Sequence, residues 1–77
     1  MPETSEIEKF VIDKIRVMRQ ERKMSQEKLS LAIGLSHSFV GNVESPKQHD
    51  KYNLNHLNSI AAVFNCSMKD FFPDRPL

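Results

Sequence analysis

A glycine between two short apolar runs, each begun by a serine, most constrains the fold of this chain. In SQEKLSLAIGLSHSFVGNVES, residues 25–45, Ser25 precedes the first run and Ser36 the second, with Gly34 between them. Serine caps helix N-termini, and glycine readily adopts the left-handed conformation in which helices commonly end. We therefore predict two helices joined by a tight turn, the first from Ser25 to Gly34 and the second over residues 36–45, capped by Ser36.

Apolar residues at helical spacing run through most of the remaining chain. They recur every three or four residues, which is the period of one helix face. Further helices are predicted from Thr4 or Ser5 to the charged run at residues 19–23, from Asn53 to Asn65, and for a last turn over residues 67–72. The residues that form these apolar stripes are Ile7, Phe10, Val11, Ile15 and Met18, then Leu29, Ala32 and Ile33, then Phe39, Val40 and Val43, and finally Leu54, Leu57, Ile60, Ala61 and Phe64.

The chain is predicted to be one all-α domain. Its 77 residues are near the size at which a single hydrophobic core suffices. No alternating strand pattern of useful length occurs, and the polar stretch SPKQHDKYN at residues 45–53 is predicted as a loop. We expect a compact five-helix bundle that forms a single domain over residues 1–77, with its core in residues 5–72 and the paired helices at residues 25–45.

Charge and composition exclude some classes of protein. Lys and Arg number 11 and Asp and Glu 10, so any basic face must come from local segregation of charge. No apolar run approaches the roughly 20 residues of a membrane span. The one cysteine, Cys66, cannot form an internal disulfide, which fits a reducing cytoplasm. We therefore expect a cytoplasmic protein with no membrane partner.

Two short helices joined through a glycine and one apolar residue match the helix-turn-helix, whose second helix reads the major groove of DNA. The chain resembles the XRE family of bacterial and phage regulators, the phage-repressor and Cro type. The resemblance covers about residues 13–72 and rests on IRVMR, MSQEKL, GLS, FVGNVE and LNHLNSIAAVFNCSMKDFF. It implies a phage-repressor-like fold that binds double-stranded DNA as a transcriptional regulator, expected to be a repressor, without a cofactor or enzymatic activity.

The chain departs from the family pattern at four places. Lys23 stands where glycine is frequent, and Ser30 stands where alanine is frequent. Gly41 removes a side chain from the exposed face of the second paired helix, and the loop at residues 45–53 is longer than the commonest family form. These differences bear on which DNA sequence is recognised and leave the expected fold unchanged.

Contacts with the DNA backbone require cations and amide donors, because each phosphate carries negative charge. The resemblance implies that Gln26 meets a phosphate at the start of its helix. Lys28, Lys47, Gln48 and Lys51 are candidates to extend that contact, although such lysines also occur on any solvated surface. For Ser36 we favour the capping role, with a phosphate contact as its second use.

Contacts with the bases are expected from the second paired helix. His37 and Ser38 lie in its predicted first turn, and Asn42 lies one turn beyond Ser38 on the same face. All three side chains can hydrogen-bond base edges, and asparagine suits the donor and acceptor pair of adenine.

The resemblance also implies an ion pair between Arg19 and Glu44. Such a pair links the first helix to the end of the third and fixes their relative orientation. It need not add net stability, because removing the two charges from water offsets much of their attraction.

Other kinds of site are less well supported by the sequence. The residues His37, His49, His56 and Cys66 do not fall at zinc-ligand spacing, so we expect no metal site. Cys66 is interpreted as a small buried residue and not as a nucleophile.

Two protein partners remain open. A weak homodimer on palindromic DNA would use Phe10 or the segment 68–77, in which adjacent Phe71 and Phe72 cannot both turn fully inward. The alternative function is an antitoxin-type or other protein-interaction module of the same fold, which holds a toxin or another protein. A basic face around Gln26 and Asn42 favours the regulator, whereas an exposed apolar patch favours the interaction module.

Overall fold

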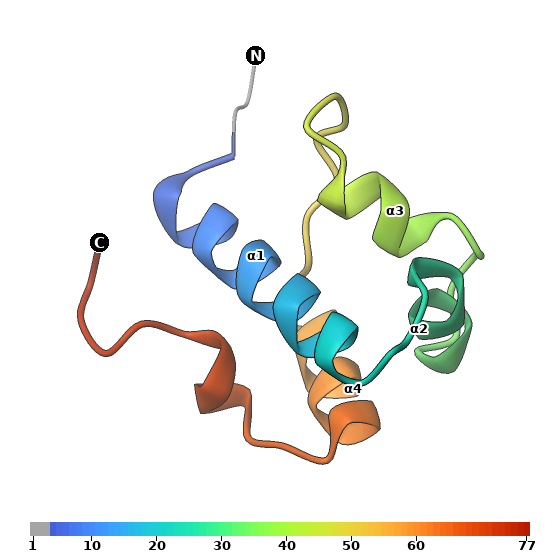
Figure 1. The fold of residues 1–77 in the computed structure, drawn as a ribbon. Coiled ribbons are helices and arrows are strands. Elements are labelled where there is room, and N and C mark those ends of the chain that lie inside the picture. The colour runs from blue at the N-terminus through green and yellow to red at the C-terminus, as the bar shows by residue number, and fades with distance from the viewer. Residues whose placement is uncertain (1–3) are drawn as a thin grey trace.

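Four α-helices and one turn of 3₁₀ helix make up the structure, a computed structural model that describes residues 4–77 (Figure 1). The helical segments are α1 (Glu6–Glu21), α2 (Gln26–Ala32), α3 (Phe39–Glu44), α4 (Leu54–Phe64) and η1 (Met68–Phe71). The predicted all-α fold is confirmed, with no strand in residues 4–77, and the fifth predicted helix is the single turn η1. In Figure 1, α2 and α3 lie together on one side of α1, and the segment after η1 lies on the other.

Side-chain caps begin four of these segments where the sequence predicts them. Ser5, Ser25, Asn53 and Ser67 each accept a hydrogen bond from a backbone N–H in the first turn that follows. Such caps satisfy N–H groups that have no partner inside the helix. Local capping chemistry therefore sets these four helix starts.

The predicted start of the third helix is wrong. We predicted a helix over residues 36–45 capped by Ser36, but regular α-helix begins only at Phe39. Residues 36–39 form a turn in which the Phe39 N–H donates to the Ser36 carbonyl at 3.1 Å. The side-chain oxygen that caps α3 comes instead from Ser30 in α2, which accepts from the Val40 N–H at 2.9 Å.

Left-handed residues end α1, α2 and α4. The φ angles are 55° at Lys23, 80° at Gly34 and 55° at Asn65, which confirms the predicted roles of Gly34 and Asn65. At each end the next residue's N–H reaches back to the helix, as Leu35 does to the Ser30 carbonyl at 3.0 Å. Lys23 adopts the conformation that glycine commonly provides in the family, and it does so at some cost in backbone strain.

The core lies between the four α-helices and η1, which packs against α1 and α4. Its buried apolar side chains are Val11, Ile12, Ile15, Met18, Leu29, Val40, Val43, Leu57, Ile60, Ala61, Phe64 and Phe71. Four residues of the predicted apolar stripes, Ile7, Phe10, Ala32 and Leu54, are exposed instead. They lie near helix ends, at the start of α1 and α4 and at the end of α2.

Candidate nucleic-acid interface

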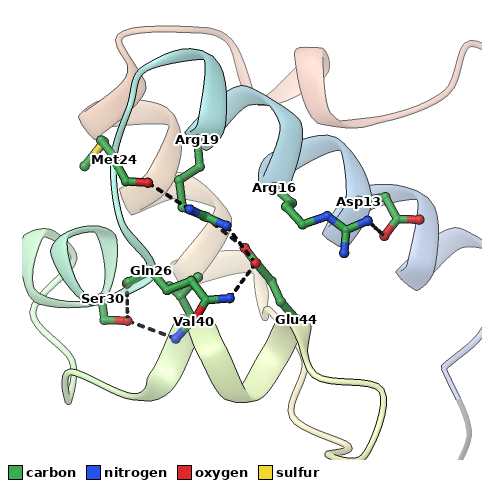
Figure 2. A network of polar contacts seen from close by, with 8 residues as sticks. All are labelled: Asp13, Arg16, Arg19, Met24, Gln26, Ser30, Val40 and Glu44. Carbon is green, nitrogen blue, oxygen red and sulfur yellow. Dashed lines mark hydrogen bonds and ion pairs between the residues drawn. The ribbon is translucent and has the colours of Figure 1, made fainter.

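The hydroxyl of Ser30 joins α2 to α3. It donates to the Gln26 carbonyl at 2.8 Å and accepts from the Val40 N–H at 2.9 Å, and its residue is fully buried (Figure 2). Sequence reasoning treated Ser30 only as a small residue that fits the family's alanine position. The sequence does hold one sign of this role. Ser30 follows Leu29 on the buried side of α2, and a buried hydroxyl needs a hydrogen-bond partner.

We expect Ser30→Ala to lower the free energy of unfolding by about 1–3 kcal/mol, because the Val40 N–H would remain buried without an acceptor. Urea unfolding followed by circular dichroism measures the change. Ser38→Ala is the matched control, since the exposed Ser38 makes no side-chain cap, and it should alter stability by less than about 0.5 kcal/mol. Equal effects of the two substitutions would contradict the bridging role of Ser30.

Arg19 and Glu44 form a buried, two-bonded ion pair between α1 and α3. The Arg19 Nε donates to Glu44 Oε2 at 3.1 Å and its Nη2 donates to Oε1 at 2.9 Å. Their side chains are only 9% and 3% exposed. The Arg19 Nη1 also donates to the Met24 carbonyl at 2.8 Å, so the guanidinium holds the turn between α1 and α2 as well (Figure 2).

Gln26 extends this network to the start of α2. Its Nε2 donates to Glu44 Oε1 at 2.8 Å, and Figure 2 shows its amide turned toward that carboxylate. Sequence reasoning assigned Gln26 a phosphate contact and missed this bond to Glu44. An amide nitrogen carries two hydrogens, and the side chain makes no other hydrogen bond within residues 4–77. One amide hydrogen therefore remains to be donated to a ligand.

The residues predicted to contact bases lie in α3 and in the turn before it. His37 and Ser38 are exposed, and Asn42 is half-buried. The Asn42 N–H donates to the Ser38 carbonyl at 2.9 Å, so these two residues are stacked one helical turn apart. Val40 and Val43 occupy the opposite, buried side of the helix.

The predicted backbone-contact residues differ in how far they are engaged within the protein. Lys28, Lys47 and Gln48 are exposed, and neither lysine forms an ion pair within the described residues 4–77. Lys51 instead contacts Glu8 at 2.9 Å, so its charge is partly neutralised. The backbone hydrogen bond from Ser5, aided by Lys51, holds the pKa of Glu8 below its ordinary value.

The two short helices α2 and α3, joined by a turn at Gly34, lie within a segment that matches a known family. A family model described as a Cro/C1-type HTH DNA-binding domain matches residues 14–76. The chain belongs to the Cro/C1-type helix-turn-helix family. The XRE resemblance predicted from the sequence is thereby confirmed, and α2, the turn at Gly34 and α3 are the helix-turn-helix of this Cro/C1-type domain.

Two solved structures share the fold of this Cro/C1-type domain. The restriction-modification controller protein C.AhdI from Aeromonas hydrophila is similar at 25% identity with a TM-score of 0.69, over 82% of this chain and 92% of that one. A hypothetical transcription factor, NHTF from Neisseria, is similar at 20% identity with a TM-score of 0.75, over 95% of this chain and 82% of that one. Among the curated proteins, no sequence matches at a significant level.

An aromatic cluster anchors the loop after α3 in this Cro/C1-type domain. The Phe39 ring lies 4.6 Å from the ring of His56 in α4 and 6.0 Å from the ring of Tyr52 in the loop, between ring centroids. The Tyr52 hydroxyl is buried without a partner in residues 4–77, and burial, aided by the Glu44 charge, raises its pKa. The loop at residues 45–53 is therefore held against α3 at its Tyr52 end.

No metal site or membrane helix is found in the described part of the chain. Residues 4–77 hold no group of three His, Cys, Asp or Glu side chains placed to bind a metal ion. None of the helices in this range has the length and apolar character to cross a bilayer. Cys66 is half-buried against the core, and burial, with a smaller effect of Asp70, raises the pKa of its thiol.

Proposed function

We propose that this Cro/C1-type domain binds double-stranded DNA sequence-specifically and represses transcription in the cytoplasm. The observation that carries the proposal is that α3 is bonded to other helices at both of its ends. Its N-terminus is capped from α2 by Ser30, and its C-terminus is held by the buried ion pair of Glu44 with Arg19 and by a hydrogen bond from the exposed Gln26. The exposed His37 and Ser38 in the turn before α3 and the half-buried Asn42 within it supply the polar side chains that base readout in the major groove requires.

The proposed contacts are of two kinds, to base edges and to phosphates, and each is made by a different group of residues. His37, Ser38 and Asn42 would meet base edges, and Asn42 would pair best with adenine. Gln26, Lys28, Ser36, Lys47 and Gln48 would meet phosphates on the two sides of α3. Because the net charge is only +1, the attraction to DNA would come from this local placement of donors and cations.

We expect Asn42→Ala and Gln26→Ala to affect binding in different ways. Loss of a base contact at Asn42 should cost about 1–3 kcal/mol on the preferred site and relax selection at one base position. Loss of Gln26 should weaken binding to all duplexes about equally, because phosphates carry no sequence information. Selection of bound fragments from random duplex DNA, followed by titration of the selected site and a scrambled site, measures both effects.

Lys69→Ala serves as the control for that experiment, since Lys69 belongs to η1 and not to α2, α3 or the loop after α3. It should leave both affinity and selectivity nearly unchanged. If Asn42→Ala binds with unaltered selectivity, α3 does not read the DNA in the proposed orientation.

We also propose that the domain pairs weakly with a second copy on palindromic DNA. Ile7 and Phe72 are 40% and 39% exposed and line one apolar hollow, and Phe10 of α1 is 36% exposed. A symmetric contact would bury this surface on both copies. Sedimentation with a palindromic duplex should give two protein molecules per duplex, and a strict one-to-one complex would contradict pairing.

A folded protein that binds no duplex would instead favour the antitoxin-type interaction module.

A further inference from the structure

We infer that Gly41 is a positioning residue for Gln26. Because glycine has no side chain, Gly41 leaves space beside the middle of α3 for the amide of Gln26, which extends from α2. A Cβ atom built on Gly41 would lie 3.1 Å from Gln26 Oε1 and 3.7 Å from Gln26 Cδ. A contact of about 3.1 Å is tighter than nine in ten real contacts to a Cβ, so the amide would have to shift by a few tenths of an ångström. This inference rests on the proposed contact of Gln26 with phosphate.

The backbone does not itself require glycine at this position. Gly41 lies inside α3, and the positive-φ residues of the described chain are Lys23, Gly34 and Asn65. Glycine inside a helix is less favourable than alanine, because it loses more conformational freedom on folding. The advantage of glycine here must therefore lie in the space beside it, and that space holds the Gln26 side chain.

The Gln26 amide is held through its nitrogen, and its oxygen occupies the space beside Gly41. Its nitrogen donates to Glu44 Oε1 at 2.8 Å, and its oxygen lies beside Gly41. Glu44 is fixed in turn by Arg19, and its carboxylate can only accept hydrogen bonds (Figure 2). The amide therefore cannot turn its oxygen toward Glu44 without repulsion, and its second N–H keeps one direction. A phosphate oxygen also only accepts, so this N–H is the group that it would bind.

A double-mutant cycle, with DNA-binding affinity as the measured quantity, tests whether Gly41 acts through Gln26. Gly41→Ala should weaken binding to a scrambled 20-base-pair duplex about three- to tenfold, as expected for one displaced hydrogen bond. Its thermal midpoint should stay equal or rise, so the loss could not be ascribed to unfolding. In the Gln26→Ala background the same change at Gly41 should have almost no further effect. Equal weakening in both backgrounds would overturn the inference, because the added methyl would then obstruct DNA directly.

A measurement without DNA separates this inference from the proposed function. In the free protein, Gly41→Ala should shift the side-chain amide resonances of Gln26 in a nitrogen-15 correlation spectrum. The side-chain amide of Asn58, exposed on α4, is the internal control and should not move. Unchanged Gln26 resonances would overturn the inference. If the resonances shift but the wild-type protein binds no duplex, the proposed function fails while the positioning by Gly41 stands.

Discussion

Alanine in place of Arg19 or Glu44 is expected to lower the free energy of unfolding by about 3–5 kcal/mol, because each change leaves the partner's charge buried and unpaired. The two side chains are 9% and 3% exposed, so water cannot replace the lost partner well. Glu44→Ala would also release the Gln26 amide, and Arg19→Ala would leave the Met24 carbonyl without its donor. Urea unfolding of each single variant measures the loss.

A double-mutant cycle measures the coupling free energy between Arg19 and Glu44 apart from their other contacts. Arg19→Met and Glu44→Leu together should cost less stability than the sum of Arg19→Met alone and Glu44→Leu alone, because no charge remains buried in the double variant. The pair Asp13–Arg16 on the surface of α1 provides the control, with side chains 37% and 39% exposed and a contact of 3.0 Å. Breaking this control pair should cost at most about 1 kcal/mol. Strictly additive effects at Arg19 and Glu44 would show that their contact carries no coupling energy.

Phe71→Ala is expected to destabilise the protein by about 3–5 kcal/mol, whereas Phe72→Ala should cost about 1 kcal/mol or less. Phe71 is fully buried, and its ring meets the edge of the Phe64 ring with centroids 6.4 Å apart. Its neighbour Phe72 is 39% exposed. Removal of the Phe71 ring therefore leaves a cavity under η1, whereas removal of Phe72 trims a partly solvated side chain.

Thermal or urea unfolding of both phenylalanine variants distinguishes these roles. Comparable losses of stability would mean that η1 does not close the core as described. In the structure Phe71 is the last residue of η1, and Phe72 follows it in extended backbone, so the two rings point in different directions. The sequence predicted that only one ring could turn fully inward, and the packing against Phe64 selects Phe71.

Local chemistry made the helix ends predictable from the sequence. Ser25 and Asn53 cap their helices through their own side chains, and Gly34 and Asn65 take left-handed conformations that suit those residues. The start of α3 was not predictable in this way. Its cap comes from Ser30, ten residues before Val40 in the sequence, so only the packing of α2 on α3 reveals it.

Contacts between distant residues limited what could be predicted about the candidate site. Arg19 and Glu44 lie 25 positions apart, and only the family resemblance paired them. The bond from Gln26 to Glu44 and the space at Gly41 arise from how closely α2 approaches α3, which no local pattern records. Helical periodicity likewise placed Ile7 in the apolar stripe, although its side chain is 40% exposed in the structure.

Titration of a duplex selected from random sequence, at about 50 mM and 200 mM salt, tests the proposed DNA binding most directly. If the exposed donors around α3 meet several phosphates, affinity should fall on the order of a hundredfold between these salt concentrations, because each contact releases bound counterions. The selected duplex should also bind more tightly than a scrambled one at both concentrations. A folded protein that binds neither duplex at 50 mM salt would contradict the proposal.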